Sequence, residues 1–230
     1  TQFFESFSEA SKSTYYLFVG KATAYTSGTT GGSDSSPPTP SDSPTDTEFY
    51  AWDSMLAAKN VTSSDISYAI PRRAWSNGTT YDMYDDNISS SSTTTSGASN
   101  LYDSTFYFMT SDYRVYKVLD NNGGTAYSGA EPTSESTSLF TTGGYVLKYM
   151  YTISASNSTK FLTTDFIPVV TDSTVSAAAT DGAIESFQVT NLGAGCTDGT
   201  YFAAIEGDGA NAGTANGASL LYTSPSPRDS

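Results

Sequence analysis

Alternating apolar and polar positions recur along the chain and predict a mostly β protein. The clearest alternation runs through "GGYVLKYMYTI", 143–153. Because successive side chains of a strand point to opposite faces, one strand is predicted here with two distinct faces. One face is predicted to hold Tyr145, Leu147, Tyr149, Tyr151 and Ile153. The other is predicted to hold Val146, Lys148 and Met150.

The segment "STFYFMTSDYRVYKVLDNNGG", 104–124, predicts a β-hairpin. Phe106 and Phe108 alternate in the first strand, and a turn is expected at Ser111 and Asp112. The second strand resumes at Val115 and Tyr116 before "DNNGG", whose composition is typical of a turn.

Three further segments read as strands, and two of them contain proline. "TYYLFVGKATAY", 14–25, is aromatic and β-branched. "SYAIPRRAW", 67–75, and "KFLTTDFIPVVT", 160–171, contain Pro71 and Pro168. Proline cannot donate a hydrogen bond to a ladder, so both strands are predicted at a sheet edge or a bulge.

Two helices are expected. Phe3, Phe4, Phe7 and Ala10 have helical spacing in "TQFFESFSEA". The stronger candidate is "DTEFYAWDSMLAAKN", 46–60, with Asp46 as N-cap and a stripe formed by Phe49, Trp52 and Leu56.

Low-complexity segments divide the chain. The segments 26–47 and 87–100 are rich in Ser, Thr, Gly or Pro and are expected to be surface loops. A β-sandwich-like domain is predicted over 1–171, followed by a small Gly-rich β module over 172–219. The end, "LLYTSPSPRDS", 220–230, is similar to a translated sequencing-library adapter, the alternative being a Pro/Ser linker. The native protein is expected to continue beyond this sequence.

Composition changes the picture in one respect. Aliphatic residues are few, but the chain has 17 Tyr, 12 Phe and 2 Trp. Aromatic rings bury large apolar areas and suit pleated sheets, so they are expected to supply the core.

Charge and missing residue types exclude several classes of function. The net charge of −14 argues against nucleic acid and anionic membranes as partners. The chain has no histidine, which removes Ser-His-Asp and Cys-His catalysis. The single cysteine, Cys196, cannot form an internal disulfide and lacks a histidine that would activate it as a nucleophile. No cofactor or metal is expected.

An acidic cluster is the remaining candidate for chemistry. "YDMYDDN", 81–87, holds Asp82, Asp85 and Asp86, which could bind Ca²⁺ or form a glycosidase pair. The spacing matches no defined calcium loop, and a solvated acidic loop is the preferred interpretation.

Two adjacent arginines, Arg72 and Arg73, stand out among only 10 basic residues. In a strand, only one of the two can face a given surface. One interpretation is structural: one guanidinium packs over rings and pairs with a local Asp, while the other is solvated. The other is that one guanidinium forks a carboxylate of a partner chain.

Five segments in order resemble one family, the baseplate wedge subunit of T-even-type contractile-tail phages in its marine cyanophage form. They are "QFFESF...TYYLFVGKATAY", "AIPRRAW", "YRVYKVLDNNGG", "GGYVLKYMYTI" and "FLTTDFIPV", within Gln2 to Val170.

The resemblance implies a non-enzymatic structural protein of the virion, located in the tail baseplate. It implies a homodimer that contacts other baseplate wedge and tail proteins. Candidate subunit-contact or fold-stabilising residues under this reading are Arg72, Arg73, Trp75, Tyr116 and Tyr149. Two alternatives stay open: a receptor- or carbohydrate-binding tail module, and a carboxylate-dependent polysaccharide hydrolase.

Overall fold

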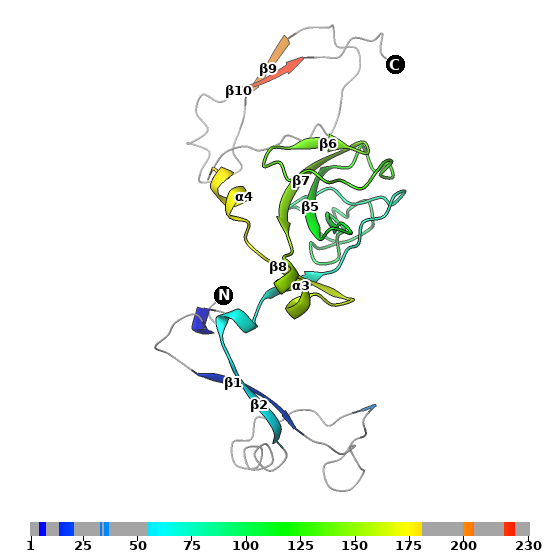
Figure 1. The fold of residues 1–230 in the computed structure, drawn as a ribbon. Helices are drawn as coiled ribbons and strands as arrows, with labels where there is room; N and C mark the ends of the chain where they lie inside the picture. The colour runs from blue at the N-terminus through cyan, green and yellow to red at the C-terminus, as the bar shows by residue number, and fades with distance from the viewer. Residues whose placement is uncertain are drawn as a thin grey trace. The chain divides into compact units, whose positions relative to one another are not determined.

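The chain forms small antiparallel sheets with a few short helices. The computed structural model describes residues 5–7, 14–20, 33, 35–36 and 55–180, and the backbone of 200–204 and 219–223. Two compact units are present, Thr1–Ala183 and Ile184–Ser230. The described strands form four sheets (Figure 1). The expected class, mainly β with a few short helices, is confirmed.

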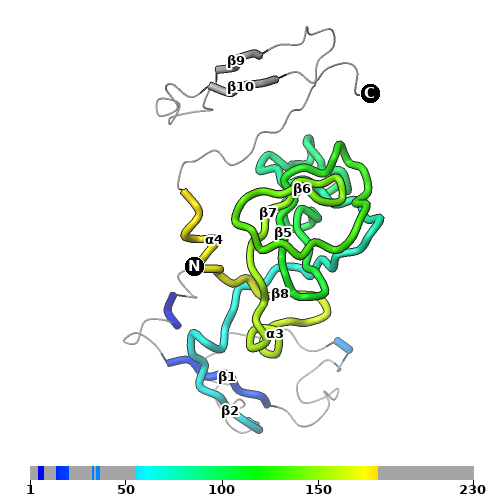
Figure 2. Tube along the Cα trace, turned by 45° about the horizontal axis from the view of Figure 1, so that its top comes forward, coloured from blue at the N-terminus to red at the C-terminus, as the bar shows by residue number. Residues whose placement is uncertain are grey.

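The largest sheet has four strands in the order β4-β5-β7-β6. These are β4 (Tyr107–Met109), β5 (Arg114–Asp120), β7 (Tyr145–Thr152) and β6 (Phe140–Thr142), with every pair antiparallel. Strands β5, β6 and β7 lie together in Figure 1 and Figure 2. The predicted hairpin is confirmed as β4 and β5. Its turn is closed by a hydrogen bond from Tyr113 N to Thr110 O (3.0 Å) across Ser111 and Asp112.

A bulge in β7 corrects the predicted two-faced strand. Tyr149 pairs with Tyr116, but the next pair joins Tyr151 to Val115, so Met150 is an extra residue. Tyr116 and Val115 are neighbours in β5 and point to opposite faces. Tyr149 and Tyr151 therefore face opposite sides of the sheet. All five predicted apolar residues are buried, but the prediction that they share one face is wrong.

Each face of this sheet carries its own core. The first core comprises Tyr81, Phe108, Tyr116, Val118, Tyr127, Tyr145, Leu147 and Tyr149. The second core comprises Tyr107, Met109, Val115, Tyr151, Ile153 and Ile167. Five of the eight residues in the first core are tyrosines, which confirms that aromatic rings supply the buried area.

The second core is closed by a two-stranded sheet of β3 (Tyr68–Pro71) and β8 (Phe166–Val169). Both strands are edges, as the prolines predicted. The proline carbonyls are also acceptors: Tyr107 Oη donates to Pro71 O (2.6 Å), and Tyr151 Oη donates to Pro168 O (3.1 Å). These bonds attach the small sheet to the large one.

Strands β1 (Tyr15–Gly20) and β2 (Met55–Val61) form a two-stranded sheet, called the ribbon below. The strand predicted at 14–25 is confirmed for Tyr15–Gly20, whereas the helix predicted over 46–60 is wrong for Met55–Asn60. Backbone groups of the β-prone β1 need partners, and pairing with β2 supplies them at the expense of helical propensity. Residues 46–54 lie outside the described part.

The sequence predicts the short helices less well than the strands. Glu5–Phe7 are helical, and the rest of the N-terminal prediction lies outside the described residues. Two helices that were not predicted are α3 (Ala155–Phe161) and α4 (Ser173–Ala178). Each is capped by a polar side chain, Ser154 Oγ for α3 and Asp172 Oδ1 for α4. Lys160 and Phe161 thus belong to a helix and not to a strand.

The second unit contains β9 (Thr200–Ala204) paired antiparallel with β10 (Ser219–Thr223). Expectations about Cys196 and about the alternation at Phe187 and Val189 fall outside the described residues. So does most of the loop 26–47. The division at 171/172 and the foreign origin of 220–230 stay predictions.

Gly143 provides a test of the first core. It has φ +59°, and a Cβ there would collide with the ring of Tyr127; Gly97 has φ +85° with open space around it. Gly97→Ala is expected to cost about 1 kcal/mol of unfolding free energy for backbone strain alone. Gly143→Ala is expected to cost about 3 kcal/mol, because overpacking is added to the strain. Urea unfolding followed by tyrosine fluorescence measures both. Equal losses would mean that Tyr127 does not pack over Gly143.

Candidate interface

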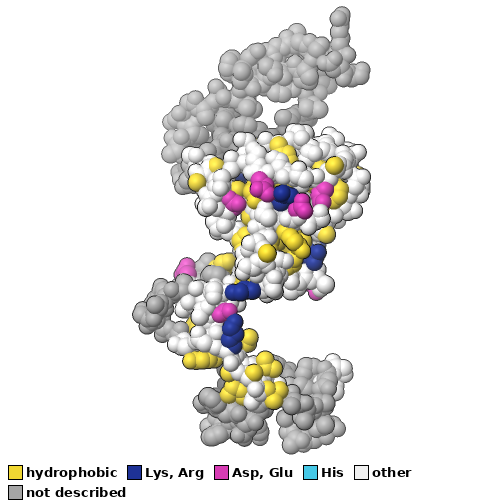
Figure 3. All heavy atoms as spheres, in the orientation of Figure 1, with side chains coloured by type: hydrophobic (Ala, Val, Ile, Leu, Met, Phe, Trp, Pro, Cys, Tyr) yellow, Lys and Arg dark blue, Asp and Glu magenta, His cyan; other side chains and the backbone are white. Residues whose placement is uncertain are grey.

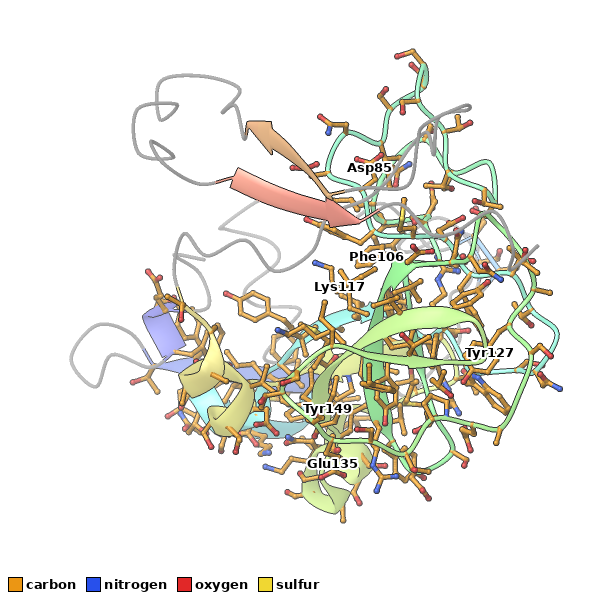
Figure 4. The ribbon with its side chains drawn as sticks, turned by 90° about the horizontal axis from the view of Figure 1, so that it is seen from above. Asp85, Phe106, Lys117, Tyr127, Glu135 and Tyr149 are labelled. Carbon is orange, nitrogen blue, oxygen red and sulfur yellow. The ribbon has the colours of Figure 1, made fainter. Side chains whose placement is uncertain are left out.

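Tyr116 and Tyr149, both predicted as contact or fold-stabilising residues, lie in the first core. Tyr116 is fully buried, and its hydroxyl donates to Ser134 O (2.8 Å). Burial raises the pKa of Tyr116, so the phenol stays neutral. The hydroxyl of Tyr149 is hydrogen-bonded to Thr152 Oγ1 (2.8 Å), and the two tyrosine rings meet edge to face at 5.9 Å. Figure 4 shows Tyr149 among the side chains of the sheet.

Trp75 packs against the same core from outside the sheet. Its ring meets Tyr127 edge to face at 5.8 Å, and its backbone N–H donates to Met109 O (2.8 Å). Its indole Nε1 is buried without a hydrogen-bond partner among the described residues. The contacts of Trp75 therefore fasten the segment after β3 to the edge strand β4.

The two arginines follow β3, which ends at Pro71. Arg72 is exposed, and its Nη1 donates to Thr163 O (3.1 Å). Arg73 is half-buried, and its Nη2 donates to the carbonyls of Asp103 (3.0 Å) and Tyr102 (3.3 Å). Within the described residues, neither guanidinium forms an ion pair, so the pairing with a local Asp that one interpretation included is not seen there.

Asp82 is fully buried, which corrects the expectation of a solvated acidic loop. Its carboxylate accepts hydrogen bonds from Ser96 N (2.7 Å), Ser96 Oγ (2.7 Å), Thr105 N (2.8 Å) and Ser104 Oγ (3.1 Å). Burial raises the pKa of Asp82, but these donors outweigh it and leave the pKa below its usual value. Asp82 thus ties the Ser/Thr loop 87–100 to the segment that leads into β4.

The other two acids of the cluster make only local contacts. Asp85 Oδ1 accepts from Asn87 N (2.8 Å), and Asp86 Oδ1 accepts from Asn87 Nδ2 (3.1 Å). Across the part of the chain that the structure describes, no three His, Cys, Asp or Glu side chains gather as metal ligands. The cluster serves the fold of this loop.

An apolar groove lies between the β3–β8 sheet and the face of the four-stranded sheet that carries the second core. Its volume is about 370 Å³, and its lining includes Ile70, Tyr102, Phe106, Tyr151 and Val169. Lys117 lines it as well, with Nζ 3.3 Å from the centre of the Tyr84 ring. In Figure 4, Lys117 and Phe106 lie beside each other, apart from Tyr127 and Tyr149.

The ribbon exposes apolar side chains on both of its faces. Tyr16, Leu17, Phe18 and Val19 are consecutive in β1 and between 46% and 66% exposed. Leu56 of β2 is 63% exposed. Apolar side chains gather over the ribbon in Figure 3. Because consecutive strand residues point to opposite faces, apolar side chains of the described ribbon are exposed on both faces.

A family model described as "Bacteriophage T4, Gp8" matches residues 1–130. The chain belongs to this family. The match includes the ribbon, both arginines and the hairpin β4–β5. No curated protein and no solved structure matches the chain.

Members of the Gp8 family are structural proteins of the phage tail baseplate wedge and are not enzymes. The hydrolase alternative is thereby removed, in agreement with the structural use of Asp82. The predicted baseplate location is confirmed at the level of the family. Among the described residues, no helix combines the length and apolarity needed to cross a bilayer.

Asp82→Asn is expected to lower the unfolding free energy by about 2 kcal/mol at pH 7, because an amide faces donors with its own N–H₂ group. The lowered pKa of Asp82 means that its ionised form stabilises the parent above the unfolded value of 3.8, and that this stability is lost as pH falls below it. The variant should therefore lose less stability than the parent below about pH 4. Urea midpoints across this pH range provide the measurement, and parallel pH profiles would contradict the assignment.

Proposed function

We propose that this Gp8-family subunit forms a homodimer within the baseplate wedge and that the ribbon is its main contact surface. The same proposal includes contacts with other wedge and tail proteins. Its principal support is the exposure of apolar side chains on both faces of the ribbon.

An isolated two-stranded sheet is marginally stable in water. The ribbon buries little of itself, since Leu17 is 64% and Val19 60% exposed although both lie in regular pairing with β2. Contiguous apolar patches of this kind mark interaction sites in soluble proteins. A protein layer on either face would bury these side chains and stabilise the pairing.

The chemistry of the ribbon suits a permanent contact. Leu17 lies opposite Lys59 and Val19 opposite Ala57, so the face they share is apolar except for one cation. That cation is paired within the chain, Lys59 Nζ lying 2.5 Å from Asp65 Oδ1. Obligate interfaces are apolar and large, and a second copy brings a matching apolar face by symmetry.

The double variant Leu17→Lys with Val19→Lys tests this proposal. Two charges on one face of the ribbon must be desolvated on assembly, which opposes contact. The parent is expected to be a dimer at about 10 µM and the variant a monomer, as measured by light scattering after size-exclusion chromatography.

Ser91→Lys with Thr93→Lys is the matched control, because it adds the same charge at two exposed positions of the Ser/Thr loop 87–100, outside the ribbon. This control should remain dimeric. A monomeric parent, or a variant that dimerises like the control, would refute the ribbon as the dimer contact.

A further inference from the structure

The groove has the composition of a binding site for side chains. Apolar residues from β3, β8 and the loop before β4 form its walls, and Leu101, Tyr102 and Val169 are partly exposed at its rim. Its volume of about 370 Å³ lies at the lower end of the range of ligand pockets, about 300–1,000 Å³. That space suits one or two aromatic or branched aliphatic side chains.

Cations gather at this groove although the chain as a whole carries −14. Lys117 lines it, and Lys148 lies directly across from Lys117 in the register of β5 and β7. Burial lowers the pKa of Lys117, and the charge of Lys148 lowers it further, against an opposing effect of Asp86. Arg73 donates a hydrogen bond to the carbonyl of Tyr102, a lining residue. Burial raises the pKa of Tyr107, another lining residue, and the positive charge of Arg73 opposes this increase.

Arg73 and Lys117 retain capacity for an anion. Among the described residues, neither Arg73 nor Lys117 has a carboxylate within ion-pair distance. Nε of Arg73 is buried and has no hydrogen-bond partner in that part of the chain. The guanidinium of Arg73 has neutral partners, the carbonyls of Tyr102 and Asp103 at Nη2 and the side chain of Tyr107. A carboxylate beside it would add the opposite charge that these partners lack.

We propose that the groove binds an acidic peptide segment of a neighbouring wedge protein, with an aromatic or branched side chain inserted between the sheets and carboxylates at Arg73 and Lys117. Charge complementarity and the apolar walls select this partner together. The source of the segment rests on the proposed function, but the binding chemistry does not depend on the ribbon. Polyphosphate partners are disfavoured because the rest of the chain is strongly acidic.

The experiment uses the intact chain and a fluorescein-labelled peptide of sequence DSEYFGWD, which carries three carboxylates and three aromatic rings and does not occur in this chain. Two matched peptides separate the contributions: NSQYFGWN lacks the charges, and DSESSGSD lacks the rings. Fluorescence anisotropy is expected to give sub-millimolar binding of the first peptide and at least about fivefold weaker binding of the other two. Raising the salt from about 0.05 M to about 0.5 M should weaken only the acidic peptides.

Arg73→Gln and Lys117→Gln are each expected to weaken binding of DSEYFGWD about three- to tenfold. Binding of NSQYFGWN should stay unchanged, which also reports that the groove is folded. Arg72→Gln is the matched control, because Arg72 contacts Thr163, which does not line the groove. It should bind like the parent.

Three outcomes would overturn the proposal: no binding of DSEYFGWD at about 1 mM, equal binding of all three peptides, or equal effects of Arg72→Gln and Arg73→Gln. Fluorescence anisotropy detects peptide binding whether the chain is a monomer or a dimer. A failed ribbon contact therefore leaves this result interpretable, and a failed peptide experiment leaves the dimer question untouched.

Discussion

A buried tyrosine must find a hydrogen-bond partner for its hydroxyl, and this constraint organises the main unit. Six buried tyrosines donate to or share hydrogen bonds with groups outside their own strand, or at its end. Five acceptors are carbonyls: Pro71 O for Tyr107, Ser134 O for Tyr116, Ala130 O for Tyr127, Thr125 O for Tyr145 and Pro168 O for Tyr151. The hydroxyl of Tyr149 shares a hydrogen bond with Thr152 Oγ1. Most of these acceptors lie in loops or in the β3–β8 sheet. Each ring thus fills the core and fastens a peripheral segment at the same time.

This arrangement explains how a chain with few aliphatic residues and long Ser/Thr loops remains folded. Loops of this composition bury little apolar area, so they need polar attachments. The tyrosine hydroxyls hold the stretch 125–134, and the Asp82 carboxylate holds the stretch around Ser96. Prolines fit the same scheme, because a strand residue that cannot donate to a ladder still offers its carbonyl to a tyrosine.

The sequence predicts the strands better than it predicts their partners. Alternation locates β7 and the hairpin, and prolines identify the edge strands. The bulge at Met150 leaves no trace in the alternation, because Tyr149, Tyr151 and Ile153 keep the two-residue spacing of a regular strand in the sequence. The helical stripe ending at Leu56 failed because pairing with β1, some 40 positions earlier, outweighs local propensity. The burial of Asp82 was hidden for a similar reason: its donors at Ser96 and Thr105 are brought to it only by the folded loop.

The pair Arg72 and Arg73 shows how one dipeptide acquires two surroundings. Because the strand ends at Pro71, the two side chains leave the sheet in different directions, one to the loop at Thr163 and the other to the carbonyls beside Tyr102. The two arginines can therefore have different roles, with Arg72 holding the loop at Thr163 and Arg73 lying beside the groove. In the described part of this subunit, the interior carboxylate of Asp82 and the buried phenols are already engaged by the fold. The proposed binding therefore uses the partly exposed apolar groove and the nearby side chains of Arg73 and Lys117, which form no ion pair among the described residues.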